Sequence, residues 1–368
     1  MITLGVEEEY LLIDPATGLP VARAAQVCRA ADLQPTLERD EVQRELLQAQ
    51  VEVATPVCHE LGEVEGHLLR MRHALGHAAE SADCRLVACG AAPFADRLVM
   101  PVTATRRYRG IHADAPQLTD EQLINGMHIH LGIPAPATKV GVLNALRPWL
   151  PLLVALSANS PMWQGIDTGF ASWRTLVFSR WPVSGPPPHF ASAEEYARRT
   201  RALAEGGMIR DAGQIYWHIR LSERYPTIEI RAADVQTRVD EAVTLAGLVR
   251  ALADRAIADL SAGRSSPQVL PETLAAAVWH GARDGCAGEA LDPICGRMRP
   301  FAEALDSLLD YAAPSLEHSG DGEQILPMVN RLLREGNGAV RQRRELRNNG
   351  KTGLVRMLVD QTSGSAAT

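Results

Sequence analysis

The stretch Gly5-Val6-Glu7-Glu8-Glu9-Tyr10-Leu11-Leu12-Ile13 decides how the rest of the chain is interpreted. It reads as an apolar strand with acidic side chains in its middle. Successive side chains of a strand point to opposite faces, so Glu7 and Glu9 share one face while Glu8 lies on the other with its apolar neighbours. Two like charges on one surface favour a counter-ion, and hard cations such as Mg²⁺ take oxygen ligands of this kind. Taken alone, two acids on one strand face are more often the solvated face of an edge strand, so the case for a metal must come from partners elsewhere.

Composition sets limits on the class of protein. At 368 residues and 46% hydrophobic side chains, the chain has material for one large domain or two ordinary ones. The net charge of -7 gives no basic excess for nucleic acid or anionic lipid, so we expect neither partner. The six cysteines form no zinc-type spacing, so we expect reduced thiols and a cytoplasmic protein. We find no signal segment and no apolar run of the roughly 18–20 residues that a membrane span needs.

Two later segments repeat the pattern of polar side chains on one strand face. Residues 51–55 alternate and stop at a proline, and Glu52 sits between two valines that face the opposite way. In Asn125-Gly126-Met127-His128-Ile129-His130-Leu131-Gly132-Ile133, His128 and His130 share a face. A lone histidine on an apolar strand is usually a hydrogen-bonded structural residue, but a pair on one strand face fits a metal or phosphate site equally well. For Glu52 alone, an exposed edge position is the simpler interpretation.

A further polar face lies in a predicted hairpin, formed by residues 214–221 and 227–231. On its second strand Glu229 and Arg231 share a face, which by itself most often means a simple ion pair. Upstream, Arg174 lies among aromatic residues. An arginine there can stack on rings and still present its fork to a carboxylate or phosphate, although a surface position is the commoner explanation.

The remaining segments are predicted to be mainly helical. Residues 93–117 show no clear period, so we expect a long loop with room for one helical turn. Beyond residue 240 we expect helices to the end, and we interpret the basic stretch 341–347 as a solvated helix face. No Gly/Ser linker marks a domain boundary. The periodic segments are helices at residues 60–83, 140–159, 241–260, 271–283, 299–316 and 322–335, and a buried strand at 84–90.

The polar strand faces are scattered over more than two hundred residues, yet each has an apolar opposite face. A single curved sheet with its concave face lined in this way would hold divalent cations and, with arginines at the rim, a polyphosphate. This repetition carries more weight than any one motif.

At this point the sequence resembles the glutamate-cysteine ligase type 2 family, or carboxylate-amine ligase group, within the glutamine synthetase superfamily. The matching motifs come in the family's order from the start of the chain to about residue 238, and the helical remainder matches in character. The motifs are Gly5-Val6-Glu7-Glu8-Glu9-Tyr10, Val51-Glu52-Val53-Ala54-Thr55-Pro56, Gly126-Met127-His128-Ile129-His130, Trp163-Gln164-Gly165 with Ser172-Trp173-Arg174, and Thr227-Ile228-Glu229-Ile230-Arg231 with Asp234-Val235-Gln236-Thr237.

The resemblance implies an α+β fold: a glutamine synthetase-like, curved, mostly antiparallel sheet that forms a funnel, with helices packed outside. Residues 1–368 would form one catalytic domain, sheet-rich over 1–238 and helical over 239–368. ATP and Mg²⁺ or Mn²⁺ would be the cofactors. By matched position, the metal ligands would be Glu7, Glu9, Glu52, His128 and Glu229, with Glu45 as a further acidic ligand. His130 and Arg231 would contact the nucleotide phosphates, Arg220 and Arg174 would do likewise or hold the substrate carboxylate, and Glu229 and Arg231 would be the catalytic pair.

The implied reaction is attack of a carboxylate on the γ-phosphate of ATP, after which an amine opens the acyl phosphate to an amide. With L-glutamate and L-cysteine the product is γ-glutamylcysteine, a step of glutathione biosynthesis, and the resemblance suggests a homodimer or larger assembly. Three alternatives stay open: another carboxylate and amine, a guanidino-phosphotransferase on fold-level analogy, and a nucleotide- or metal-binding module without catalysis. The sequence does not show which group accepts the proton of the amine.

Overall fold

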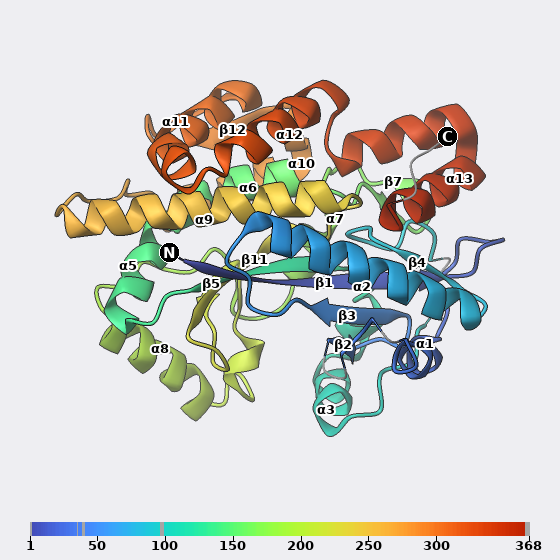
Figure 1. Cartoon of the computed structure of the whole chain (residues 1–368). Coiled ribbons are helices and arrows are strands. Elements are labelled where there is room, and N and C mark those ends of the chain that lie inside the picture. Colours follow the sequence, from blue (N-terminus) through green and yellow to red (C-terminus); the bar gives the residue numbers. More distant parts are fainter. Residues whose placement is uncertain (1, 35, 39–40, 96–98, 365–368) are drawn as a thin grey trace.

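The computed structural model describes residues 2–34, 36–38, 41–95 and 99–364. Its centre is an antiparallel sheet with helices around it (Figure 1). Within the described residues this sheet has seven strands, in the spatial order β10, β11, β5, β1, β3 and β2, with β4 paired to β1. The strands are β1 (Thr3–Ile13), β2 (Val42–Arg44), β3 (Gln50–Ala54), β4 (Arg85–Val87), β5 (Gly126–Gly132), β10 (Ile219–Leu221) and β11 (Thr227–Asp234).

Helices cover the sheet and extend beyond it. Helices α2 and α9 lie along one face of the sheet, and α11 and α12 pack against α9, above it in the view of Figure 1. The helices are α1 (Ala24–Ala31), α2 (Leu61–Ser81), α3 (Arg106–Asp114), α4 (Pro116–Asp120), α5 (Pro136–Leu146), α6 (Leu150–Ser157), α7 (Trp173–Phe178), α8 (Ala193–Glu205), α9 (Val239–Ser261), α10 (Pro271–Asp284), α11 (Phe301–Ser319), α12 (Gly322–Glu335) and α13 (Gly338–Thr362). Short pairs complete the chain: β6 (Met162–Trp163) with β7 (Ile166–Asp167), β8 (Ser184–Gly185) with β9 (Tyr216–Trp217), and β12 (Glu289–Asp292) with β13 (Arg297–Pro300).

The core lies between the sheet and the helices α2 and α9. On β1 the even-numbered side chains Leu4, Val6 and Leu12 are buried, and they belong to the same apolar cluster as Leu68 and Met71 of α2. Burying one face of each strand fixes which side chains point inward, because a slip of one residue would turn the apolar side chains outward. The opposite face of β1, with Glu7 and Glu9, is thereby directed away from this core.

The predicted α+β fold is confirmed, and so are the strands at the acidic and histidine motifs. The helices expected at residues 60–83, 241–260 and 271–283 correspond to α2, α9 and α10, and the apolar segment 140–159 divides at its prolines into α5 and α6.

Three local predictions are wrong. The loop expected over residues 93–117 contains α3 and the start of α4; Thr105 caps α3 by accepting a hydrogen bond from the Tyr108 amide, and residues 96–98 of the expected loop lie outside the described residues. The stretch beyond residue 240 is interrupted by the β12–β13 hairpin. The basic stretch 341–347 is only partly solvated, because Arg341 is buried in an ion pair with Glu241.

The segment Pro136–Ser157 is long and apolar enough to pass as a membrane span by length and composition, contrary to our expectation from the sequence. In the structure it comprises α5 and α6, and 89% of its most apolar window is buried inside the protein. Its hydrophobic character is therefore accounted for by packing against α9, α10 and β11.

Candidate active site

The register of the central strands brings the predicted ligand residues together. Between β1 and β5, Glu7 lies opposite His128, and between β1 and β3, Glu9 lies opposite Glu52. Between β11 and β5, Glu229 lies opposite His130. Residues that are opposite on antiparallel strands have side chains on the same face and in contact. The five carboxylate and imidazole positions predicted from separate motifs to hold metal therefore converge at one place on the sheet.

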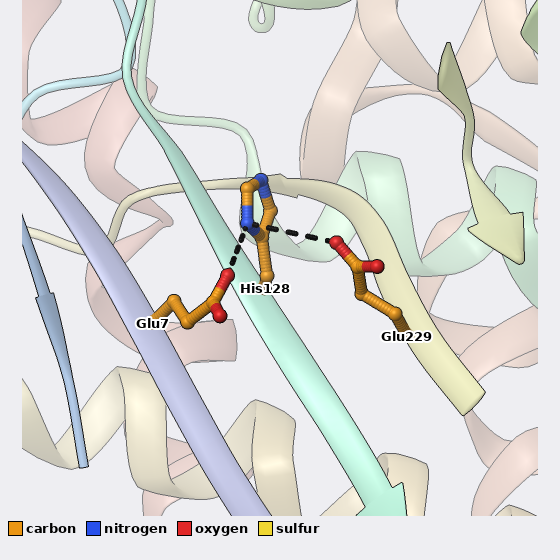
Figure 2. Close-up of side chains that lie close together, drawn as sticks. All are labelled: Glu7, His128 and Glu229. Atoms are coloured by element: carbon orange, nitrogen blue, oxygen red, sulfur yellow. Dashed lines mark hydrogen bonds and ion pairs between the residues drawn. The ribbon is translucent and has the colours of Figure 1, made fainter. Parts of the chain in front are cut away.

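His128 is the centre of this cluster. Its Nδ1 atom lies 2.9 Å from a carboxylate oxygen of Glu7 and 4.0 Å from one of Glu229, and Figure 2 shows the two acids on either side of the ring. The Nε2 atom is buried without a hydrogen-bond partner and lies 3.8 Å from a carboxylate oxygen of Glu9. Among the described residues, two sets have ligand atoms close enough for one cation: Glu7, His128 and Glu229, and Glu9, Glu52 and His128.

Two arginines hold Glu229. Arg220 binds it with both arms of its fork, at 2.7 and 3.1 Å, and Arg231 forms an ion pair with the same carboxylate. Arg220 also donates to the carbonyls of residues 213 and 215, so its described contacts secure Glu229 and the neighbouring loop. Arg231 reaches further into the cluster, with Nη1 3.4 Å from Nδ1 of His128.

His130 follows His128 by two residues on β5, so the two side chains lie on the same face of the sheet. Its Nε2 atom lies 3.3 Å from a Glu7 carboxylate oxygen, and its Nδ1 atom is 2.9 Å from the Thr227 hydroxyl. The exposed ring of Tyr225 meets the His130 ring edge to face, with centroids 6.1 Å apart. His130 thus connects the acidic cluster to the β10–β11 turn.

Arg174 reaches the cluster from α7. Its side chain is buried, its guanidinium carbon lies 5.3 Å from the centre of the Phe178 ring, and Nη2 donates to the carbonyl of Arg231. Gly126 makes room for it, since a Cβ atom at this position would lie 2.3 Å from Nη2. The Gly126 amide in turn donates to Glu9 at 2.5 Å.

Glu45 also reaches the site, from the segment between β2 and β3. Its carboxylate accepts a 3.0 Å hydrogen bond from the hydroxyl of Tyr108 on α3. Tyr108 was missed in the sequence, because it lies in the segment that we assigned to a loop; Thr105, three residues before it, was the helix-capping signal that marks this helix.

The charges of the cluster are far from balanced. Burial, and then the charge of Glu7, raise the pKa of Glu52 well above its ordinary value, and burial together with the charge of Glu9 raises the pKa of Glu45 to about 7. Burial also raises the pKa of Glu9, against the charge of Arg174. A nearby positive charge stabilises the ionised form of such buried carboxylates, and a divalent cation would supply that charge.

Two acids behave in the opposite way. Burial would raise the pKa of Glu7, but hydrogen bonds with His128 and His130 outweigh it and lower the pKa. For Glu229 the charges of two arginines likewise outweigh burial and lower the pKa. Burial, and then the charge of Arg231, lower the pKa of His128 to about 4, so its ring is neutral at pH 7. Ionised carboxylates around a neutral imidazole form a donor set that fits Mg²⁺ or Mn²⁺.

The cluster lies in a pocket of about 670 Å³. All ten site residues predicted from the sequence line it: Glu7, Glu9, Glu45, Glu52, His128, His130, Arg174, Arg220, Glu229 and Arg231. The pocket continues to α3 and α7 on one side, at Tyr108 and Phe178, and to α8 and the β10–β11 turn on the other, at Thr200 and Tyr225. It therefore offers space on both sides of the acidic cluster.

A hydrogen-bond network behind the pocket holds Arg174 in place. The buried Asp234 accepts bonds from the Asn159 amide at 2.8 Å, the Ser160 hydroxyl at 2.7 Å and the Ser172 hydroxyl at 2.9 Å. The amide of Arg174 donates to the same Ser160 hydroxyl at 3.0 Å. The sequence placed Asp234 in a motif without indicating this role.

Comparison with known proteins agrees with this geometry. The chain is 43% identical over 348 residues, 94% of each chain, to a Mycolicibacterium vanbaalenii protein provisionally named glutamate–cysteine ligase 2-2. It is 42% identical over 340 residues, 92% of this chain and 88% of the other, to a Nocardia farcinica protein provisionally named glutamate–cysteine ligase 2-1.

Solved structures share the fold. A glutamate–cysteine ligase from Francisella tularensis, determined in complex with AMP, superposes with a TM-score of 0.72 at 10% identity, covering 99% of this chain and 88% of that one. A bifunctional glutathione synthetase from Pasteurella multocida superposes with a TM-score of 0.70 at 14% identity, covering 99% of this chain and 51% of that one. The sequence itself matches the glutamate–cysteine ligase family 2 over residues 3–361, and the chain therefore belongs to that family.

Proposed function

We propose that the protein is an ATP-dependent carboxylate–amine ligase that joins L-glutamate to L-cysteine, giving γ-glutamylcysteine, ADP and phosphate. The observation that supports this most directly is the acidic cluster around a neutral His128, flanked by Arg231 and lying in a single pocket of a family 2 chain. The family names and the AMP complex of the Francisella enzyme agree with the proposal.

In the proposed site, Glu7, Glu9, Glu52, Glu229 and His128 hold Mg²⁺ or Mn²⁺, with Glu45 as a further acidic ligand. A bound divalent cation supplies charge neutralisation for the phosphates of ATP. The chain's own side chains act beside it: Arg231 and His130 face the phosphates, and Arg174 holds a phosphate or the substrate carboxylate. Arg220 keeps Glu229 ionised and oriented through its two-armed contact.

The first step forms a bond from a carboxylate oxygen of the substrate to the γ-phosphorus of ATP, and the bond to ADP breaks. Its barrier is mainly charge repulsion between two anions, which fixed cations such as Arg231 lower. In the second step the amine nitrogen attacks the acyl carbon, inorganic phosphate leaves, and the nitrogen loses a proton to a pocket carboxylate or to the phosphate.

The described chain is proposed to act as one catalytic unit, because its C-terminal helix is bonded to the network behind the pocket. Gln342 of α13 donates to both the carbonyl and the side-chain oxygen of Asn159, at 2.8 Å each. Near the other end of α13 the Thr362 hydroxyl accepts a 2.8 Å bond from the Ala88 amide. Removing the last helix would therefore disturb the loop that holds Asp234 and Arg174.

The test is ADP release with ATP and Mg²⁺ across a matrix of carboxylates, including L-glutamate, against amines, including L-cysteine, with products identified by mass. We expect ADP and γ-glutamylcysteine in equal amounts. Glu317→Gln, at an exposed position of α11, is the matched control for Glu229→Gln. An amide from another pair would keep the chemistry and change the substrates, whereas ATP binding without ADP from any pair would refute the ligase proposal.

A further inference from the structure

The middle residue of the acidic run on β1 takes no part in the pocket. Glu8 points to the opposite face of the sheet, where its side chain and that of Arg72 on α2 are both fully buried, with exposed fractions of 0%. Arg72 binds the carboxylate with two atoms, Nη2 at 2.6 Å and Nε at 3.0 Å, and the Tyr10 hydroxyl donates to it as well. An ion pair so deep in an apolar layer costs desolvation energy on both partners.

Arg72 also binds a second part of the sheet. Its remaining donors reach the carbonyls of Gln236 and Thr237, each at 2.8 Å, in the segment that leaves β11. In the strand order β11, β5, β1, these contacts lie on either side of the histidine strand β5. One guanidinium on the back of the sheet therefore connects the two strands that deliver Glu7 and Glu229 to His128.

The sequence of β1 makes such a connection useful. A shift of one residue exchanges the two faces of a strand. The buried apolar side chains of β1 oppose that shift. A shift of two residues, however, keeps the same face inward and still leaves a glutamate facing the pocket, so the apolar pattern and the acids discriminate weakly against it. A buried guanidinium accepts a carboxylate at one position only, because an unpaired charge in the apolar layer is strongly unfavourable. Buried polar pairs are best attested in this role of fixing register.

We propose that Glu8 and Arg72 are positioning residues that set the register of β1, so that Glu7 and Glu9 stand opposite His128 and Glu52. The consequence for function rests on the metal-dependent activity proposed above. The pair also joins β1 to the segment after Asp234, so it fixes the acidic cluster and the Arg174 network relative to each other.

The experiment compares Arg72→Met and the apolar double variant Glu8→Leu/Arg72→Met with Arg250→Met. Arg250 is a matched control: it is buried, pairs with Asp321 at 2.6 Å and donates to a backbone carbonyl at 2.6 Å, but it lies in α9 away from the pocket. Mn²⁺ binding is measured by titration calorimetry well below each unfolding midpoint, together with hydrogen exchange of the β1 amides.

We expect both Arg72 variants to bind Mn²⁺ at least about tenfold more weakly and to exchange the β1 amides faster. Arg250→Met should unfold at a lower temperature with unchanged Mn²⁺ affinity. A folded double variant with the Mn²⁺ affinity and β1 exchange of the parent would overturn the proposal. If the parent binds no Mn²⁺, the proposed metal chemistry fails, and hydrogen exchange alone decides whether the pair sets the register.

Discussion

Replacing Gly126 by alanine tests whether the placement of Arg174 matters for turnover. The added Cβ would lie 2.3 Å from Nη2, 2.9 Å from Cζ and 3.1 Å from Nε of Arg174, so it meets the guanidinium group as a whole. Nonbonded heavy atoms prefer roughly 3.5 Å or more, so the fork must move by about 1 Å. It has little freedom to do so, since the buried guanidinium lies near the Phe178 ring and Nη2 donates to the Arg231 carbonyl.

A displacement of about 1 Å at a positioning group costs on the order of 10²-fold in turnover. We therefore expect Gly126→Ala to lower kcat by about that factor, with an intact cooperative unfolding transition. The effect on stability separates two explanations. Alanine in a strand without a clash would stabilise the protein by about 0.5–1 kcal/mol, whereas a forced shift of a buried guanidinium should reduce its stability.

The assay is steady-state ADP release alongside thermal unfolding. Gly66→Ala is the control, because a Cβ at Gly66 on α2 would have no atom within 4 Å. It should leave kcat unchanged and add up to about 1 kcal/mol of stability. Parent-like kcat in Gly126→Ala, with increased stability, would refute the placement of Arg174 described above.

The remaining predictions concern charge and metal. Glu229→Gln should lower turnover at least about 10²-fold and destabilise the fold by about 3 kcal/mol, because it removes the shared partner of two arginines; steady-state kinetics and chemical denaturation check both. Asp234→Asn should weaken the network under Arg174 and lower kcat more than it raises the KM for ATP, which a kinetic comparison with the parent would show. A chelator should stop turnover, and added Mg²⁺ or Mn²⁺ should restore it; activity that survives exhaustive chelation would remove the metal from the mechanism. Burial lowers the pKa of His218 from 6.5 in the unfolded chain to about 3 in the folded protein. As the pH falls below 6.5, the imidazole is therefore protonated in the unfolded chain but not in the folded protein, and the free energy of unfolding decreases. Between about pH 7 and about pH 5 the loss should be about 2 kcal/mol, and His218→Gln should abolish that part of the pH dependence in denaturation curves.

The strand pattern was enough to predict which side chains share a face. Glu7 with Glu9, and His128 with His130, follow from the two-residue period of a strand. It was not enough to predict which strands are neighbours: nothing in residues 51–55 indicates that Glu52 lies opposite Glu9. Which strands pair depends on the packing of the whole core, so it cannot be predicted from one segment. The resemblance to a known family supplied the expectation that these strands lie in one sheet.

The residues that the sequence left unassigned act through contacts without a period. Tyr108 reaches Glu45 from a helix whose only local signal was its cap at Thr105. The basic stretch in the C-terminal helix is a second case. Its charges suggested a solvated helix face, but Arg341 is buried in an ion pair with Glu241, a hundred residues earlier in the chain. In both cases the decisive partner comes from another element, and its identity is a property of the tertiary structure.

Glu8 shows the limit most clearly, because its face was predicted and its role was not. Alternation placed it opposite Glu7 and Glu9, among apolar neighbours, where an unpaired carboxylate would be strongly unfavourable. A buried carboxylate is therefore expected to pair with a cationic side chain from another element, and this expectation follows from the sequence before the partner is known. The structure supplies it in Arg72, whose fork faces the back of the strands that build the pocket. An acid predicted on the apolar face of a strand is accordingly a reason to search for a buried arginine, and for the pairing that it enforces.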